Sequence, residues 1–230
     1  MPVLISLGFW QLGRAETKEQ LLASYEAKSQ SMMDVSQLLA QEDMAFQRVS
    51  LEGVYDNGRS FLLDNKTFHG RVGYEVITPF ILANPPASSR ADNDIEIVLV
   101  NRGWLPMGPS RQQLPDIPGV KGTLAIIATV DVPEREAFVL QDQPLTGSWP
   151  LVIQISDVAR MAEELGQPTF PFVVRLSTDS TGALQTVWKP VIMQPEKNFA
   201  YAVQWFALAA TLSVLFIFAT IKRTNEAHSE

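Results

Sequence analysis

The sequence predicts an α+β membrane protein in which a small antiparallel, β-rich and barrel-like domain lies outside the membrane, between two transmembrane helices. An uncharged apolar segment near the C-terminus is long enough to cross a bilayer, and a shorter one opens the chain. Strand-like stretches separated by turn residues fill the middle. We expect a partial N-terminal transmembrane segment that begins within the span (1–13), a periplasmic β-rich domain (14–198), a transmembrane helix (199–221) and a cytoplasmic tail (222–230).

The C-terminal segment is the clearest element of the sequence. Residues 199–221 contain no charge and exceed the roughly 20 apolar residues that a membrane span needs. Tyr201 and Trp205 lie near its start, where aromatic side chains favour the headgroup level, and Lys222 and Arg223 follow its end as a cytoplasmic flank. Gln204 is expected to form a hydrogen bond across a pair of helices.

The N-terminal segment is shorter. Residues 1–12 are uncharged but too few to span, and they lack the basic start and cleavage site of a secretory signal. We interpret them as the outer half of a first transmembrane helix; a short amphipathic or buried segment is the alternative. Arg14 and Lys18 would favour a cytoplasmic position, but long loops cross membranes largely regardless of charge, so the Lys222–Arg223 pair decides the orientation.

Helical and strand patterns alternate in the domain between these segments. Helical spacing covers 15–45, with Asp34 as a predicted N-cap, and 156–165, with Gly166 just after its end. The predicted strands are 46–54, 60–64, 72–80, 95–104, 122–132, 149–155, 171–176 and 184–189. The predicted turns are Asp56-Asn57-Gly58, Asp64-Asn65 and Pro118-Gly119. The closely spaced strands favour a small sheet or barrel with helices at its edges.

Composition excludes several functions. The net charge of −7 and the pI near 4.9 exclude a nucleic-acid binder that coats phosphates. The absence of cysteine excludes thiolate metal sites, thiol nucleophiles and covalent haem attachment. The two histidines, His69 and His228, are too few for a multi-histidine metal site. Since no nucleophile–base set or paired-carboxylate pocket stands out, we expect no enzyme; a membrane-tethered periplasmic enzyme remains an alternative.

Three ordered groups of motifs carry a family resemblance. They are Gly8-Phe9-Trp10-Gln11-Leu12-Gly13-Arg14 with Lys18; Leu63-Asp64-Asn65-Lys66, Gly70-Arg71-Val72-Gly73-Tyr74, Thr78-Pro79 and Val98-Leu99-Val100-Asn101-Arg102-Gly103-Trp104; and Tyr201-Ala202-Val203-Gln204-Trp205-Phe206. In this order, over residues 8–223, the chain resembles the surfeit locus protein 1 (SURF-like, Shy-type) family of cytochrome c oxidase assembly factors.

The resemblance implies a chaperone of respiratory-chain biogenesis in the bacterial inner membrane, with two transmembrane helices and the main domain on the periplasmic side. It implies help in inserting haem a, bound transiently, into the large catalytic subunit of a haem-copper oxidase. The implied partners are that subunit, membrane lipid and the proteins that synthesise haem a. The alternative is a scaffold that stabilises an oxidase assembly intermediate and binds no haem.

One position departs from the family pattern. The family carries a histidine, regarded as a haem ligand, just ahead of its final helix, and Asn198 stands at that position here. An asparagine amide is not an axial ligand of haem iron, which takes His, Cys, Met or Tyr. Of the other candidates, His69 is predicted to lie in a solvated turn, His228 in the cytoplasmic tail, and Met193 to serve packing.

Two further groups are candidate contacts for haem. On a strand, Arg102 and Trp104 would share a face with Val98 and Val100, where the guanidinium could bind a haem propionate or a partner carboxylate. We favour a structural Arg–Trp stack at the barrel edge. The second group lies where the two helices meet the outer membrane surface, as an amphipathic vestibule for a porphyrin or as simple interfacial anchoring, and the sequence favours neither. Its members are Trp10, Gln11, Arg14, Tyr201, Gln204 and Trp205.

Overall fold

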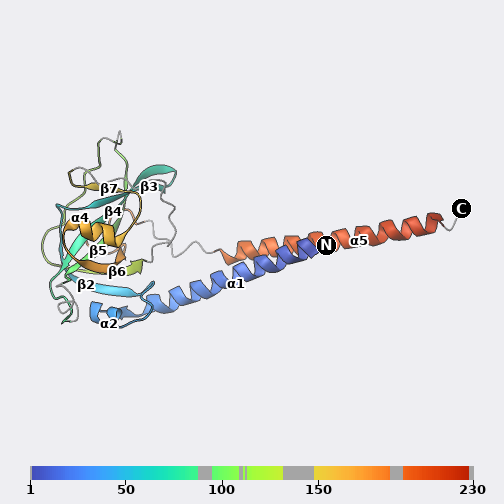
Figure 1. Cartoon of the computed structure of the whole chain (residues 1–230), viewed down its shortest axis with the longest axis horizontal. Helices are drawn as coiled ribbons and strands as arrows, with labels where there is room; N and C mark the ends of the chain where they lie inside the picture. The colour runs from blue at the N-terminus through green and yellow to red at the C-terminus, as the bar shows by residue number, and fades with distance from the viewer. Residues whose placement is uncertain are drawn as a thin grey trace. The chain divides into compact units, whose positions relative to one another are not determined.

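The chain folds into two compact units. The structure is a computed structural model that describes residues 2–87, 95–108, 111, 113–131, 148–186 and 194–227. One unit, Ala27–Trp188, holds the strands, and the other combines Met1–Glu26 with Lys189–Glu230 and holds the two long helices (Figure 1). The β-rich domain and the C-terminal apolar helix that the sequence predicts are therefore both present.

Five strands of the β-rich unit close into a barrel. They are β2 (Arg48–Tyr55), β4 (Arg71–Leu82), β5 (Ile97–Pro106), β6 (Leu124–Asp131) and β8 (Thr169–Leu176). The ring runs β2–β6–β8–β5–β4 and closes where Tyr55 of β2 pairs with Phe80 of β4. Three strands extend the sheet: β1 (Met32–Met33) beside β2, β3 (Phe61–Phe68) beside β4, and β7 (Leu151–Ile153) beside β3.

The predicted antiparallel sheet is only partly correct. Strands β5 and β8 pair in parallel, as do β1 with β2 and β3 with β7, whereas the other pairs are antiparallel. The alternation of apolar and polar residues has a period of two in either direction. The alternation therefore predicts the strands and their buried face, but it does not predict whether neighbouring strands run parallel or antiparallel.

The barrel interior is apolar and close-packed. Alternate residues of β2, among them Val49, Leu51 and Tyr55, point inward and meet Val100 of β5 and Val174 of β8 in one cluster. The short helix α2 (Val35–Leu39) packs Val35 and Leu38 into the same cluster. Its predicted N-cap is confirmed, because the Asp34 carboxylate accepts a hydrogen bond from the Gln37 backbone while the Gln37 side chain accepts one from Asp34.

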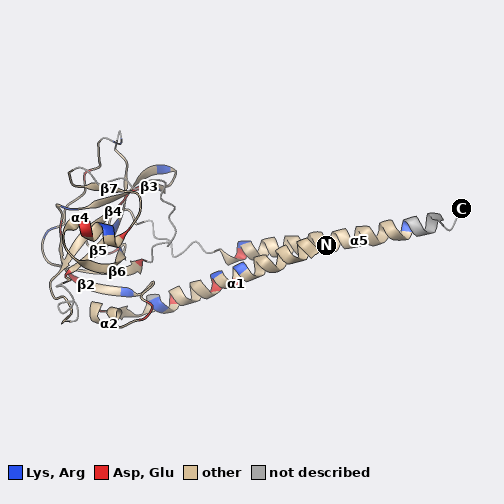
Figure 2. Cartoon of the chain, viewed as in Figure 1, with Lys and Arg blue, Asp and Glu red and all other residues tan. Residues whose placement is uncertain are grey.

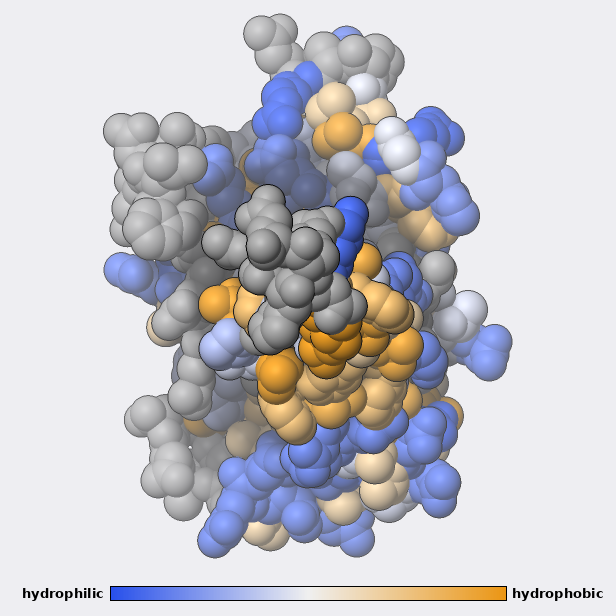
Figure 3. Space-filling model, turned by 90° about the vertical axis from the view of Figure 1, so that its right-hand side faces the viewer, coloured by the Kyte–Doolittle hydropathy of each residue, from blue (hydrophilic) through white to orange (hydrophobic). Residues whose placement is uncertain are grey.

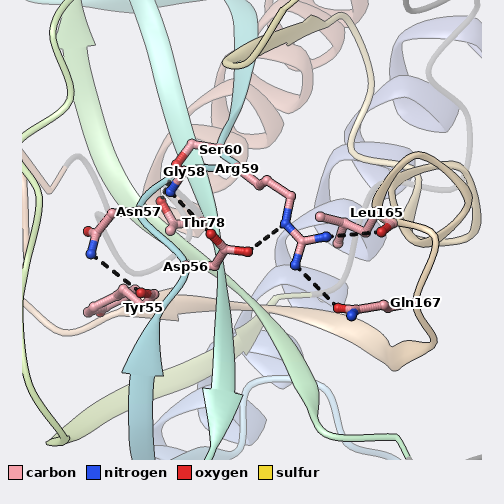
Figure 4. A network of polar contacts seen from close by, with 9 residues as sticks. All are labelled: Tyr55, Asp56, Asn57, Gly58, Arg59, Ser60, Thr78, Leu165 and Gln167. Carbon is pink, nitrogen blue, oxygen red and sulfur yellow. Dashed lines mark hydrogen bonds and ion pairs between the residues drawn. The ribbon is translucent and has the colours of Figure 1, made fainter.

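Helix α4 (Val158–Leu165) covers the outer face of the sheet, where Met161 and Leu165 join a second apolar cluster. Asp157 caps its start, and Gly166 ends it at a φ of 65°, as predicted. The predicted turn at Asp56–Gly58 is tied to this end of α4 by Arg59 (Figure 4). The Arg59 guanidinium pairs with Asp56 at 2.5 Å and donates to the Leu165 carbonyl at 3.1 Å.

The predicted turn at Asp64-Asn65 is wrong. Both residues lie within β3, at a bulge where the pairing with β4 shifts between Leu63 and Lys66. Asn65 has a φ of 60°, and its backbone N–H donates to the Asp64 carboxylate. Asx residues that tolerate left-handed backbone serve bulges and turns alike, so the residue types could not separate the two.

The helical unit contains α5 (Pro195–Ala227) and α1 (Pro2–Gln30) up to Glu26. Helix α1 carries no charge before Arg14 and many after it, and α5 is uncharged between Lys197 and Lys222 (Figure 2). Within the described residues, only Pro195–Lys222 is long and apolar enough to cross a membrane. Residues 2–13 are helical, but they belong to a helix that continues to Gln30, and membrane insertion of this segment stays a prediction.

Candidate functional site in the helix pair

Asn198, in the first turn of α5, is the centre of a polar cluster within the helical unit. Its carboxamide oxygen accepts a hydrogen bond from the Lys18 ammonium at 2.7 Å, and its NH2 group donates to Oε1 of Gln11 at 2.6 Å. Gln11 and Lys18 are two turns apart on α1, so both project from one face of that helix. One side chain of α5 thus connects two side chains of α1.

Small residues allow the two helices to approach closely. Gly8 of α1 faces the Phe206 ring so closely that a Cβ at this position would lie 2.6 Å from two ring carbons. The Phe9 ring meets Phe206 edge to face at 5.3 Å. Since Asn198 contacts Gln11 while Phe206 contacts Gly8 and Phe9, the helices run antiparallel. Small residues at such contacts are typical of helix pairs in membranes.

The residues of the predicted vestibule are only partly brought together. Gln11 is part of the polar cluster, and the Arg14 guanidinium lies over the Trp10 ring at 5.8 Å. Trp10 and Tyr201 are 57% and 53% exposed, as interfacial anchors would be. Gln204 is exposed as well. Among the described residues, Asn198 and not Gln204 forms the side-chain hydrogen bond from α5 to Gln11 of α1.

The helical unit exposes a large apolar surface (Figure 3). It comprises Val3, Ile5, Phe9 and Trp10 of α1 and Phe199, Tyr201, Val203, Leu208, Leu212, Val214, Leu215, Phe216, Ile217, Phe218 and Ile221 of α5. Exposed apolar area of this extent marks a contact with membrane or protein. With the length and composition of α5, it indicates association with a membrane.

The geometry does not fit axial ligation of haem iron at position 198. Both ends of the Asn198 carboxamide are engaged, with Lys18 at the oxygen and Gln11 at the nitrogen. An amide lacks the donor strength of imidazole, and ligation through this oxygen would compete with the charge-assisted hydrogen bond from Lys18. Residue 198 therefore connects helices here.

Arg102 is enclosed in the β-rich unit. It is 1% exposed, donates to the carbonyls of Gly182 at 2.9 Å and Pro118 at 2.8 Å, and lies over the Tyr55 ring at 5.1 Å. Burial lowers the pKa of Arg102 and raises the pKa of Tyr55 to about 12, although the nearby guanidinium favours the phenolate. The structural role favoured for Arg102 agrees with this, but the ring that it contacts is Tyr55, not Trp104.

Trp104 does not share a face with Val100. Gly103 pairs with Val76 and Asn101 with Ile77, so Arg102 is an extra residue in a bulge of β5. Trp104 therefore pairs with Glu75 while Val100 pairs with Thr78, on the other face of β4. Its indole is 2% exposed and donates to the Lys66 carbonyl at 3.0 Å, which leaves no surface for a porphyrin.

Of the remaining metal candidates, only His69 is among the described residues. It lies with Gly70 in the two-residue turn between β3 and β4, where both residues have positive φ, and its side chain is exposed. The predicted solvated turn is confirmed. Met193 and His228 lie outside the described residues.

The sequence did not reveal a charged row on the outer face of the barrel. Asn101 donates to Glu75 at 2.9 Å, Lys66 lies 3.9 Å from Glu75, and Arg175 pairs with Asp131 at 2.9 Å. Burial raises the pKa of Asp131, and Arg175 opposes that shift. These residues come from five strands, so strand order alone brings them together.

The chain is similar to known proteins over almost its whole length. The model of the SURF1 family matches residues 1–210. A SURF1-like protein of Monosiga brevicollis is 26% identical, covering 97% of this chain and 85% of its own length. One from Rickettsia felis is 24% identical, covering 94% and 91%, and the surfeit locus protein 1 of Rattus norvegicus is 24% identical, covering 95% and 72%.

The fold and the helix pair define a class: proteins in which a closed β-barrel domain interrupts two helices that pair with each other, one of them apolar enough to span a membrane. The family match covers the paired parts of both helices and the whole barrel. The chain belongs to the SURF1 family.

Proposed function

We propose that this protein is a membrane-anchored assembly factor for a haem-copper cytochrome c oxidase, acting by binding and releasing an immature large catalytic subunit. Family membership supports the assembly role. The observation that carries the mode of action is the helical unit, in which apolar α5 side chains remain exposed beside a fixed α1. Such a surface suits contact with the apolar helices of an unassembled membrane subunit.

We place the protein in the bacterial inner membrane with the barrel on the periplasmic side. Lys222 and Arg223 follow the apolar part of α5, and clustered basic residues mark the cytoplasmic flank of a span. The same argument places Asn198, at the opposite end of the span, at the periplasmic surface. Residues 2–13 of α1 would then lie in the outer leaflet beside the first half of α5.

Handling of haem a stays a proposal that follows from the family resemblance. Asn198 does not fit as an axial ligand, and the enclosed Arg102 and Trp104 offer no contact to a propionate. These observations favour the second candidate function, a scaffold that stabilises an assembly intermediate and binds no haem. In either case the chain needs no chemistry of its own, and we propose no enzymatic activity.

Co-purification tests the proposal. The full chain is solubilised in mild detergent from cells that lack the late-assembling oxidase subunits, and the large subunit is sought by mass spectrometry. We expect it with the wild type and expect a strain deleted for this protein to make less active oxidase from an unchanged amount of transcript. Normal oxidase content in the deletion strain would contradict the proposal.

An absorption spectrum separates the two candidates. The protein is purified from cells that make haem a, as wild type and as Asn198→His. A Soret band in the wild type would support a haem chaperone with a ligand elsewhere. A band in Asn198→His alone would support the scaffold, because the surroundings would accept haem while the native residue 198 does not ligate it.

A further inference from the structure

Lys18 is held in a cluster that contains more hydrogen-bond donors than acceptors. The Lys18 ammonium has three donors and uses one on Asn198, and the NH2 group of Gln11 is left over once its oxygen has accepted from Asn198. Within the described parts of the chain, no carboxylate pairs with Lys18. The cluster thus presents a positive charge and several N–H groups that a group rich in oxygen could accept.

The cluster is preorganised. Lys18, Gln11 and Asn198 are all partly buried, and the contact with Asn198 fixes the ammonium at 2.7 Å instead of leaving it on a mobile four-carbon stem. The neighbours Arg14, Glu16, Glu19, Glu196 and Lys197 are exposed and carry nearly balanced charge. Attraction of an anion would therefore come from this geometry and not from a diffuse positive field.

The cluster also marks one level along both helices. Helix α1 is uncharged before Arg14, and α5 is uncharged from Asn198 to Ile221, so the change from charged to apolar surface occurs on each helix beside the same cluster. Exposed Trp10 and Tyr201 lie within a turn of it, as aromatic side chains do at the headgroup level of a bilayer. The phosphate groups of phospholipids lie at this headgroup level.

We propose that Lys18, Gln11 and Asn198 form a binding site for the phosphate of an anionic lipid headgroup. The ammonium supplies the charge, the Gln11 amide donates a hydrogen bond, and Asn198 positions both. The acyl chains of this lipid lie against the exposed apolar side chains of α1 and α5. The inference rests on the proposed placement of α5 in the membrane, and flotation of the protein with vesicles tests that placement separately.

The test measures lipid preference. The full chain is reconstituted in vesicles of phosphatidylcholine with a minor fraction of spin-labelled phosphatidylglycerol or spin-labelled phosphatidylcholine, and the immobilised fraction of each label is compared. Lys18→Gln removes the charge but keeps a donor for Asn198. Because a Lys near an anionic surface contributes about 1 kcal/mol, we expect the preference for phosphatidylglycerol to fall about fivefold.

Two variants serve as controls. Lys18→Arg keeps the charge and should retain most of the preference. Lys197→Gln removes an equal charge from the residue next to Asn198 but lies outside the cluster, and should change the preference little. If Lys197→Gln lowered the preference as much as Lys18→Gln, or if Lys18→Gln left it unchanged in protein that still floats with vesicles, the site would be refuted.

Two further outcomes identify other ligands. Displacement of the labelled lipid by inorganic phosphate at low concentration would mean a phosphate site that does not require lipid, and would overturn the assignment to a headgroup. If Lys18→Gln instead abolished co-purification of the oxidase subunit and left the lipid preference intact, the ammonium would serve a protein carboxylate, and the lipid site would be overturned. Flotation and co-purification of the wild type show whether the proposed function itself has failed.

Discussion

At the scale of single residues, Gly73 and Trp104 show how a bulge of the barrel depends on close packing. The Trp104 ring lies against Gly73 of β4, in the space that a side chain at position 73 would occupy. The Asn101 oxygen accepts a hydrogen bond from the Gly103 backbone inside the bulge, and Gly103 has a φ of 122°. These residues stabilise the bulge by close packing and by a local hydrogen bond.

Replacement of Gly73 by alanine should destabilise the barrel. The added Cβ would lie 2.1 Å from the Leu105 carbonyl oxygen and 2.5 Å from the Trp104 ring, so backbone and indole would both have to move. We expect the free energy of unfolding to fall by roughly 2–3 kcal/mol, measured by urea titration of tryptophan fluorescence. Gly58→Ala, whose nearest neighbour is a side-chain oxygen at 3.5 Å, is the matched control and should change little.

Tyr55 should make the barrel sensitive to alkali. Its pKa is raised from 10.0 to about 12 by burial, so between these values the unfolded state has lost a proton that the native state keeps. The native state then binds more protons, and stability falls as the pH rises through this interval, by roughly 3 kcal/mol when complete.

Urea titrations on either side of this interval measure the loss. Tyr55→Phe keeps the ring over Arg102 but cannot ionise, so this variant should lose less stability across the same pH range. An equal loss in wild type and Tyr55→Phe would show that another group, such as Tyr74, whose pKa burial also raises, is responsible.

At the scale of elements, the pairing of α1 with α5 depends on shape and on one polar contact. The absence of a side chain at Gly8 leaves room for the Phe206 ring, and Ala15, Ala202 and Ala209 are buried in the same unit. Close approach of small residues stabilises helix pairs where no water is available to drive association. The Asn198 cluster then selects one alignment of the two helices, since sliding by a turn would separate Asn198 from Gln11.

Enlarging Gly8 should separate the helices. A leucine there would overlap the Phe206 ring, whereas a Cβ added at Gly13 would have no atom within 4 Å, so Gly13 is the matched control. Because the native chain has no cysteine, Gln11→Cys and Asn198→Cys, at positions whose side chains touch across the two helices, form a unique pair for a short bismaleimide and leave the Phe206 ring in place. We expect cross-linking to fall severalfold with Gly8→Leu and to be retained with Gly13→Leu; equal loss in both would argue against a close-packed pair.

At the scale of the whole molecule, a closed barrel is combined with a helix whose length and composition indicate association with a membrane. The barrel has an apolar interior and a charged outer row, while α5 exposes its apolar residues on several sides. An exposed apolar surface of this extent is stable in lipid or against another apolar protein, whereas in water it favours aggregation. Association with the membrane should therefore depend on α5.

A charge in the middle of α5 should weaken that association. Leu208 is 54% exposed near the centre of the candidate span, and an arginine there costs about 2.5–3.5 kcal/mol on insertion. We expect Leu208→Arg to lower the fraction of full-length protein that floats with vesicles. Val152→Arg places the same charge on β7 and should float like the wild type; if Leu208→Arg also did, α5 would not be the membrane anchor.

The sequence by itself determined the features that depend on neighbouring residues. The apolar length of α5, the positions of most strands, the Asp34 cap and the Gly166 terminus follow from composition and local hydrogen bonding. Each requires only residues within a few positions of one another, and local chemistry is the same in any fold.

Only the tertiary structure decided which distant segments meet. It closed β2 on β4, paired β5 with β8 in parallel, and placed an extra residue at Arg102 that turned Trp104 to the other face. It also joined Asn198 to Lys18, 180 positions away along the chain. Apolar residues that recur every 2 or 3.6 positions predict the buried face of a strand or helix, but they do not predict which element packs against it. That choice depends on the packing of the whole chain.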